Sequence, residues 1–471
     1  MNQTLIARSR FGLGATADEG PLSDPRGWLI EQLAPQRAIP TTLAGVPTTL
    51  EALSATRQVV QARKARKAAE VMASETLAAI TMKPPGMTPP ETLFEIYARQ
   101  VQARLNAALT TDTPFRERLV HFWTNHFAVS ADKQQTKALV GPFEIEAIRA
   151  NLDRSFGHML QAVVQHPAML LYLDNERSFG PGSALVQRRQ DRGQRKLGLN
   201  ENLAREILEL YSLGVRTGYV QADVTELARA ITGWSVQSER PQAARFAQNG
   251  GQGFAFYPMS HEPGRRTLLG KTYGQGGMGQ GEAMLRDLAR HPATARHIAT
   301  KLVRHFVADE PPPAAVARLE QVFLETDGDL PSLHRALVGL EQAWVSDGAG
   351  KFKTPWDYVV SVGRLVDLPP MRPGQIAGLF AQLGQPVYTP GAPAGWPDAT
   401  ASWLSSDGLS KRIQLATQVG HMRGATPDAR RLAEAQFGDA LSVGTGSALA
   451  NAESPVQALT LLLASPEMMR R

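Results

Sequence analysis

The chain has 471 residues, of which 43% are hydrophobic and 20% charged, and its formal net charge is +6 at pH 7. This balance is ordinary for a globular protein and excludes a wholly disordered or collagen-like chain. The length allows two or three average domains, or one large domain with insertions, and the lack of cysteine excludes disulfides, thiolate chemistry and cysteine zinc sites.

The N-terminal residues Met1 to Arg10 lack the apolar stretch of a secretion signal. No run elsewhere approaches the roughly 18 apolar residues that span a bilayer. We therefore expect no membrane span and a cytoplasmic protein, with a periplasmic location open if a leader has been removed.

The first part of the chain predicts short amphipathic helices, one of them around Trp28. A longer helix is predicted from Leu50 to Met82, ended by Pro84-Pro85-Gly86 because proline cannot continue a helix. Within it, the basic run Arg57 to Lys67 has the composition of a nucleic-acid or anionic-surface patch, but a solvated helix face is the commoner explanation. We expect no nucleic-acid partner.

The sequence predicts the limits of three later helices. Apolar residues recur at helical spacing from Glu91 to Leu109. Two further helices are predicted to begin at the N-caps Asn200 and Asp223 and to stop at Gly214 and Gly233, where glycine suits a left-handed residue.

Between residues 245 and 281 the pattern becomes alternating on both sides of the turn Glu262-Pro263-Gly264, which predicts a β-hairpin near 253–273. Helical periodicity resumes at 292 and continues to about 368. The stretch 383–407 is rich in proline and glycine and predicts a long ordered loop before C-terminal helices.

These elements predict a mainly α fold, a large helical bundle-like single body with one small β-hairpin. We divide it into an N-terminal helical region at 1–90, a helical core at 91–368 with the hairpin inserted at 245–281, and a part at 369–471 in which the proline- and glycine-rich loop and C-terminal helices pack on the core.

Short blocks spread along the chain carry a family resemblance. They are Arg10-Phe11-Gly12-Leu13-Gly14-Ala15, Phe122-Trp123-Thr124-Asn125-His126-Phe127, Asn200-Glu201-Asn202-Leu203-Ala204-Arg205-Glu206, Leu213-Gly214-Val215, Asp223-Val224, Thr232-Gly233-Trp234, His291-Pro292-Ala293-Thr294-Ala295, Thr326-Asp327-Gly328-Asp329-Leu330 and Lys353-Thr354-Pro355. In this order they resemble, from about Arg8 onward, the bacterial domain-of-unknown-function family numbered 1800.

The resemblance implies no particular reaction. Genes of this family often neighbour those of a family numbered 1501, which resembles sulfatases and alkaline phosphatases and often bears export signals. The resemblance therefore implies an envelope or export-linked pathway, with a protein of that second family as a partner.

The block around His126 supplies candidate site residues on one helix. If residues 114–129 form a helix, His121 and Asn125 lie on a polar face and His126 lies on an apolar face, about 140° from His121. The two histidines then cannot share a metal ion, and we expect neither metal nor cofactor. His121 and Asn125 are candidate ligand contacts and His126 a candidate acid or base, although a histidine on an apolar face is more often a hydrogen-bonded core residue.

The helix after Asn200 has a polar ladder with Arg205 between carboxylates. The alternatives are exposed helix ion pairs, each worth roughly 0.2–0.5 kcal/mol, or a partly buried cluster aimed at a cavity. On the second alternative, Arg205 and Glu206 meet the segment of Asn125 and His126. The candidates are catalytic Arg205, Glu206 and Glu209, with Asn200 and Asn202 as ligand contacts.

The predicted hairpin adds two candidates, His261 as a catalytic residue and Lys271 as a ligand contact, and the block Thr232-Gly233-Trp234 adds Trp234 as a further ligand contact. Nearby, Gly274-Gln275-Gly276-Gly277-Met278-Gly279 fits a dinucleotide-binding pattern, but without a following strand and acidic residue a flexible loop is the commoner explanation.

Two functions remain open. No serine-hydrolase elbow, P-loop or zinc-protease motif is present, which favours a binding or accessory module for a protein partner or an anionic ligand. The alternative is a hydrolase or transferase with a Glu/His/Arg cluster in a central pocket.

Overall fold

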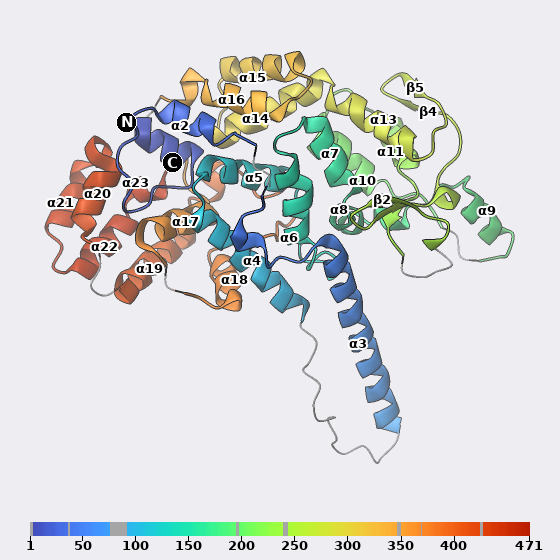
Figure 1. Ribbon diagram of the computed structural model, residues 1–471, viewed down its shortest axis with the longest axis horizontal. Helices are drawn as coiled ribbons and strands as arrows, with labels where there is room; N and C mark the ends of the chain where they lie inside the picture. Colours follow the sequence, from blue (N-terminus) through green and yellow to red (C-terminus); the bar gives the residue numbers. More distant parts are fainter. Residues whose placement is uncertain are drawn as a thin grey trace.

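Helices dominate the computed structural model, which describes residues 3–35, 38–75, 92–194, 197–238, 244–345, 350–368, 370–423 and 427–471. Of these residues, 61% are helical and 4% lie in strands. Buried apolar side chains form one cluster that includes residues from Ile6 to Met469. The predicted mainly α fold is confirmed, and the helices form one elongated body (Figure 1).

The N-terminal segment packs on the centre of the body before a long helix leaves it. Its short elements are α1 (Gln3–Ile6), the π-helical turn η1 (Ala7–Phe11), α2 (Pro25–Glu31) and the 3-10 turn η2 (Thr41–Leu43). Helix α3 (Thr49–Glu75) then projects away from the other helices (Figure 1). The rest of the predicted helix to Met82, and its stop at Pro84-Pro85-Gly86, lie outside the described residues.

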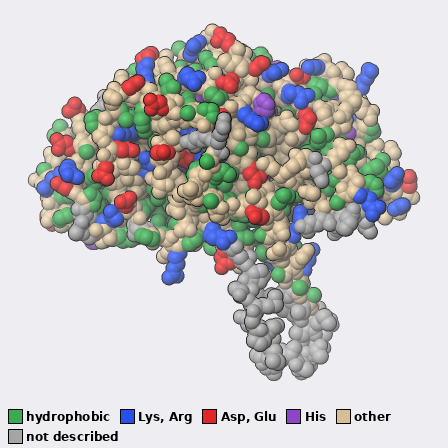
Figure 2. All heavy atoms as spheres, in the orientation of Figure 1, with side chains coloured by type: hydrophobic (Ala, Val, Ile, Leu, Met, Phe, Trp, Pro, Cys, Tyr) green, Lys and Arg blue, Asp and Glu red, His purple; other side chains and the backbone are tan. Residues whose placement is uncertain are grey.

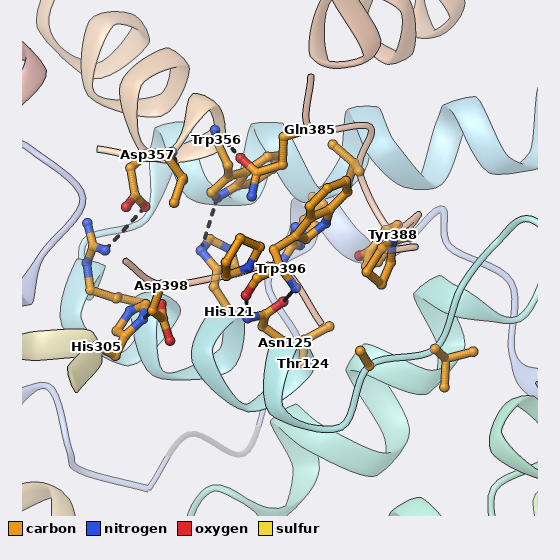
Figure 3. Close-up of a pocket in the computed structure, with 18 residues that line it drawn as sticks. His121, Thr124, Asn125, His305, Trp356, Asp357, Gln385, Tyr388, Trp396 and Asp398 are labelled. Atoms are coloured by element: carbon orange, nitrogen blue, oxygen red, sulfur yellow. Dashed lines mark hydrogen bonds and ion pairs between the residues drawn. The ribbon is translucent and has the colours of Figure 1, made fainter. Parts of the chain in front are cut away.

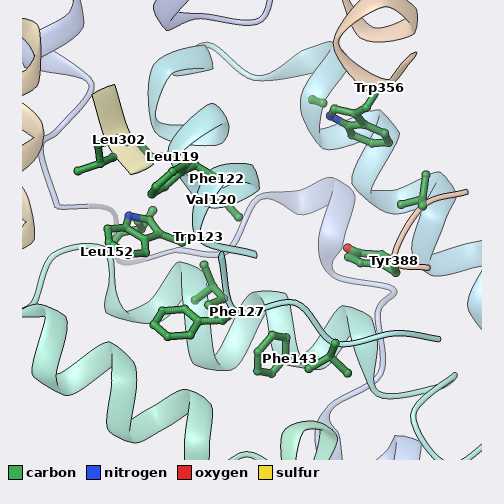
Figure 4. Packing of buried hydrophobic residues seen from close by; sticks show 14 of the residues in the cluster. Leu119, Val120, Phe122, Trp123, Phe127, Phe143, Leu152, Leu302, Trp356 and Tyr388 are labelled. Carbon is green, nitrogen blue, oxygen red and sulfur yellow. The ribbon is translucent and has the colours of Figure 1, made fainter. Parts of the chain in front are cut away.

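Two helices, α4 (Leu93–Thr110) and α5 (Pro114–His126), form the centre. A capping box of Thr92 and Glu95 fixes the start of α4, and Pro114 suits the first position of α5. The side chains of Phe122 and Trp123 pack among other apolar residues around α5 (Figure 4). Because α5 is buried on nearly all sides, its polar residues must find partners inside the protein.

The chain then forms the helices at one end of the body. They are α6 (Val140–Phe143), η3 (Glu144–Ile148), η4 (Arg149–Asn151), α7 (Phe156–Gln165), α8 (Pro167–Tyr172), η5 (Asn175–Arg177), α9 (Ala184–Gln190), α10 (Asn202–Glu206), the π-helical turn η6 (Ile207–Tyr211) and α11 (Gln221–Ala230). Gly214 and Gly233 have the predicted positive φ angles. Asp223 is not an N-cap: it lies inside α11, where its carboxylate accepts from the Val220 N–H instead.

Four of the five described strands lie in the predicted region at 245–281, and their pairing differs from that of the predicted hairpin. Strand β3 (Phe254–Phe256) lies between β1 (Trp234–Val236) and β2 (Gln248–Gly251), all antiparallel. A separate hairpin joins β4 (Arg266–Leu268) to β5 (Lys271–Tyr273). The turn Glu262-Pro263-Gly264 therefore connects two small sheets rather than two paired strands, because β3 is already paired on both edges.

The remaining helices complete the body. They are η7 (Pro258–Ser260), α13 (Met278–Ala289), α14 (Pro292–Phe306), α15 (Pro313–Glu325), α16 (Leu330–Val338), η8 (Glu341–Ala343), α17 (Pro355–Val366), α18 (Pro373–Gln382), η9 (Thr400–Ser402), α19 (Ser406–Arg423), α20 (Ala429–Phe437), η10 (Gly438–Ala440), α21 (Val443–Ala450), α22 (Pro455–Leu463) and α23 (Pro466–Met469). Between α18 and η9 lies the predicted proline- and glycine-rich loop.

Distant parts of the chain are joined by polar contacts. The backbones of Lys351 and Arg471 exchange two hydrogen bonds of 2.9 Å. The Arg364 guanidinium donates to the carbonyls of Gly14 and Ala108, the second near the end of α4. The core cluster includes residues of all three predicted regions, and the division at 90 and 368 stays a prediction.

The visible face of the molecule carries both signs of charge. Lysine and arginine side chains are interspersed with acidic ones over it, without a large patch of one sign (Figure 2). In the described part of the chain, no helix combines the length and apolar character needed to cross a membrane.

Candidate functional site

A cavity at the centre of the body gathers polar and aromatic side chains from five segments (Figure 3). It lies between α4, α5, α14, the start of α17 and a segment of the loop after α18, which we call the strap (residues 385–398). The residues that line it are Arg104, Arg118, His121, Thr124, Asn125, Ala128, Val129, His305, Thr354, Trp356, Asp357, Gln385, Val387, Tyr388, Pro390, Trp396, Pro397 and Asp398.

Helix α5 presents its polar face to this cavity. Arg118, His121 and Asn125 follow one another at spacings of three and four residues, so helix geometry places them on one side. His126 lies elsewhere: its Nε2 is 3.3 Å from the Tyr211 carbonyl. His121 and His126 therefore lie on different sides of α5, as the sequence predicts.

His121 is held between Trp356 and a buried ion pair. Its Nδ1 accepts a hydrogen bond of 3.2 Å from Trp356 Nε1, and its Nε2 lies 3.4 Å from Glu117. The Glu117 carboxylate also accepts a hydrogen bond of 2.7 Å from each terminal nitrogen of Arg149. Burial, followed by the charge of Arg104, lowers the pKa of His121, so the ring is neutral with its hydrogen on Nε2.

The Arg104 guanidinium lies over two aromatic rings. Its guanidinium carbon lies 4.4 Å from the Trp356 ring centre and 4.9 Å from that of Tyr388. Its Nε lies 2.9 Å from Glu144, which accepts from the Tyr388 hydroxyl at 3.0 Å. Within the described residues, the terminal nitrogens of Arg104 form no hydrogen bond, which leaves their N–H groups for a ligand.

A histidine and a carboxylate face each other on the other side of the cavity. His305 Nδ1 and Asp398 are 2.6 Å apart. Burial lowers the pKa of His305 to about 4 in spite of Asp398, so His305 is neutral at pH 7. Among the described residues its Nε2 has no hydrogen-bond partner.

The adjoining carboxylate of Asp357 joins two cations. One of its oxygens lies 3.2 Å from Arg118 and the other 3.3 Å from Arg471. Burial opposes its ionisation, but these two guanidinium groups hold the pKa of Asp357 well below its usual range. Asp357 is therefore ionised, and its charge offsets part of the positive charge beside the cavity.

The strap closes one side of the cavity through Asn125. The Asn125 side-chain amide donates to the Trp396 carbonyl at 2.8 Å, and its oxygen accepts from the Trp396 N–H at 2.7 Å. Gly395 has a φ of +79°, and a Cβ there would lie 2.3 Å from the Asn125 carbonyl. Only glycine allows this close approach.

The predicted junction of Arg205 with His126 is not formed. Arg205 lies 3.4 Å from Glu201 and 3.5 Å from Glu209, and its side chain is 38% exposed. These are the exposed helix ion pairs of the first alternative. The helix instead reaches His126 through its π-helical end, because a helix leaves its last carbonyls unpaired.

The other predicted residues of that helix are dispersed. Glu206 is half-buried, and burial followed by Glu209 raises its pKa. Asn200 binds the Asp174 carbonyl at 3.2 Å and the Asn202 N–H at 2.9 Å. None of these residues, among those described, lines the central cavity.

The candidates from the strand region lie apart from the cavity as well. His261 Nδ1 is 2.9 Å from the Thr232 carbonyl, Trp234 is fully buried, and Lys271 forms an exposed ion pair of 2.6 Å with Asp287. His261 and the loop 275–279 share a separate surface hollow. Of the predicted site residues, the central cavity thus brings together His121 and Asn125.

The sequence reasoning missed Arg104, Trp356, Tyr388 and Asp398. One signal was present: Thr354, in the block Lys353-Thr354-Pro355, caps α17 and so fixes the position of Trp356 two residues later. Arg104 gave no such signal, since an arginine on an amphipathic helix is ordinarily exposed. Within the described part of the chain, no group of histidine and acidic residues is placed to hold a metal ion.

With this geometry in view, the comparisons with known proteins place the chain in a family. The chain belongs to the family described as "Protein of unknown function (DUF1800)", whose sequence pattern matches residues 6–470. No curated protein and no solved structure matches it. The function must therefore be argued from the cavity itself.

Proposed function

We propose that the protein is a binding module whose central cavity holds the anionic group of a small ligand. The observation that carries this proposal is Arg104, a buried guanidinium whose Nε is paired with Glu144 and whose central carbon lies over the rings of Trp356 and Tyr388. A guanidinium edge offers parallel N–H groups that match a carboxylate, phosphate or sulfate.

The surroundings of Arg104 support tight binding. Its side chain is only 11% exposed, so charge-assisted hydrogen bonds there are weakly screened by water. The two rings already hold the guanidinium in one orientation, which lowers the entropic cost of ordering it on binding. His305 beside the cavity is neutral and can accept a proton when an anion arrives.

The implied partner family suggests which anions to test. Sulfatases and alkaline phosphatases, which the implied partner family resembles, act on sulfate and phosphate esters, and these carry oxyanions of the kind a guanidinium edge binds. We infer that the module serves an envelope or export-linked pathway together with such a partner. Its ligand would then carry a sulfate or phosphate group.

Calorimetric titration with inorganic sulfate, inorganic phosphate and simple sulfate and phosphate monoesters tests the proposal. We expect Arg104→Met to weaken binding at least about tenfold, since a hydrogen bond to a charged group contributes roughly 1.5–3 kcal/mol. Arg26→Met is the matched control, because Arg26 also stacks on a tryptophan, Trp344, and pairs with Glu341, but lies outside the cavity. Equal affinity in the Arg104 variant would contradict the proposal.

One observation favours the alternative, a hydrolase or transferase. His305 is oriented by Asp398, and its Nε2 has no hydrogen-bond partner among the residues that the structure describes, which is the arrangement of a general base. The same titrations distinguish the two functions, because an enzyme would release alcohol from the monoesters and a binding module would leave them intact.

A further inference from the structure

A second polar pair lies outside the central cavity, at the junction of the two ends of the chain. The Nζ of Lys353 is 3.0 Å from the Oγ of Ser361 and 2.8 Å from the Met468 carbonyl. Both side chains are almost fully buried. Ser361 lies on α17, two turns after the block that contains Lys353.

This pair lines an inner cavity of about 40 Å³. The wall of the inner cavity is mostly apolar and includes Leu5, Leu365 and Phe437. Gly14 adjoins Ser361 so closely that a Cβ would lie 2.8 Å from the serine Cβ, and glycine therefore keeps the space beside the hydroxyl open. A cavity of about 40 Å³ has room for about three water-sized groups.

The inner cavity adjoins a larger groove of about 350 Å³. The two share Leu5, Ser9, Phe437 and Glu467. The groove also has polar residues, among them Ser442 and Arg470. Its size and polarity suit a hydrophilic group, while the inner cavity suits a short acyl group.

We propose that Ser361 and Lys353 form a serine–lysine dyad that hydrolyses esters of a short acyl group, of acetyl size, with a polar alcohol. The acyl group occupies the inner cavity, and the alcohol lies in the groove. Ser361 lies on α17 and Lys353 just before the start of that helix, so the pair is positioned without a serine-hydrolase elbow.

The protons and bonds balance without a cofactor. Neutral Lys353 takes the proton from Ser361 Oγ as that oxygen attacks the ester carbonyl carbon, and the lysine then gives the proton to the alcohol oxygen as its bond to the acyl carbon breaks. Water next attacks the acyl-serine, its proton passing through Lys353 to Ser361 Oγ. The products are a carboxylic acid and an alcohol.

The protonation of Lys353 suits this role. Burial lowers the pKa of Lys353 to about 7, and the opposing effect of Asp357 is offset by neighbouring guanidinium groups. Near pH 7 a substantial fraction of the lysine is therefore neutral and able to act as a base. The Ser361 hydroxyl also lies 3.0 Å from the Tyr358 carbonyl, and rotation about its Cβ–Oγ bond directs the hydrogen to Lys353.

Reaction of the folded protein with 4-nitrophenyl acetate tests the dyad. We expect release of nitrophenolate and, after acid quenching, an acetyl group on the peptide that contains Ser361. Ser361→Ala should abolish both and Lys353→Met should slow them about a hundredfold or more, the usual contribution of a general base. Ser212→Ala is the matched control, because Ser212 is also a buried serine whose hydroxyl donates to a backbone carbonyl, that of Ile207, but it lines neither the inner cavity nor the groove.

Two further measurements separate catalysis from a merely structural bond. The rate for the unaltered protein should rise with pH through about 7, and 4-nitrophenyl hexanoate should react far more slowly than the acetate because its chain exceeds the inner cavity. Acetylation that misses Ser361, or hydrolysis unchanged in the folded Ser361→Ala variant, would overturn the proposal. These outcomes are independent of anion binding at Arg104.

Discussion

At the scale of single residues, the charged side chains of α5 show why a burial pattern is hard to predict. Arg116, Glu117 and Arg118 follow one another, which in a sequence is typical of a surface, yet all three are buried. Their partners are Asp153, Arg149 and Asp357. These partners lie 32 to 239 residues away, so no local pattern could reveal them.

We predict that Glu117→Gln strongly destabilises the fold. Burial raises the pKa of Glu117, but the charge of Arg149 together with hydrogen bonds from His121 and Arg149 outweighs burial and holds that pKa well below its usual range. Removing the carboxylate leaves Arg149 buried and uncompensated, which costs about 3–5 kcal/mol. Urea unfolding at pH 7 measures the change in the free energy of unfolding.

The matched control for that prediction is Glu341→Gln, which breaks an exposed pair with Arg26. Exposed pairs contribute little because water and salt screen them, so this variant should unfold at nearly the urea concentration of the unaltered protein. Equal midpoints for the two variants would contradict the assigned role of Glu117.

At the scale of elements, helix limits were predictable where the signal was local. The stops at Gly214 and Gly233 depend on the backbone angles of single residues, and both are confirmed. The strand partners were only partly predictable, because β3 pairs across a short turn with β2 but also with β1, about 20 residues earlier. The strap was predicted as an ordered loop, but its role as a cavity wall depends on Asn125, about 270 residues away.

We predict that Gly395→Ala opens the strap. The new Cβ would clash with the Asn125 carbonyl, and φ at this residue is +79°, so both hydrogen bonds to Trp396 should be lost. Hydrogen exchange of the Trp396 amide should accelerate about tenfold or more, equivalent to one lost hydrogen bond. Exchange is read by mass spectrometry of the strap peptide.

Gly391→Ala provides the comparison within the same strap, since a Cβ there meets no atom within 4 Å. This variant should exchange at the original rate. If both variants exchange alike, the contact between the strap and Asn125 does not hold the loop closed.

At the scale of the whole molecule, buried neutral histidines occur in many parts of the core. Seven of the ten histidines, spread from α5 to α16, have pKa values below the usual one, in each case chiefly through burial. The pKa falls to about 4 for His305 and to about 3 for His334. Unfolding exposes these rings to water, where they bind a proton near pH 6.5.

We predict that acid destabilises the protein well above pH 4. Between the folded pKa values and about 6.5 the unfolded chain binds more protons, so stability rises with pH in this window and is lost as pH falls through it. His305 and His334 together change the free energy of unfolding by about 3 kcal/mol per pH unit in this window. The urea midpoint should therefore fall steeply from pH 6.5 to 4.5, and a constant midpoint would contradict neutral burial.

The separation of the cavity's parts along the chain has a consequence for synthesis. Arg104 leaves the ribosome long before His305, Trp356 and the strap that ends at Asp398. At 5–20 residues per second, the interval is about 15 to 60 s. During that time Arg118 of the nascent α5 has no Asp357 to pair with, so the central cavity can form only after most of the chain has been synthesised.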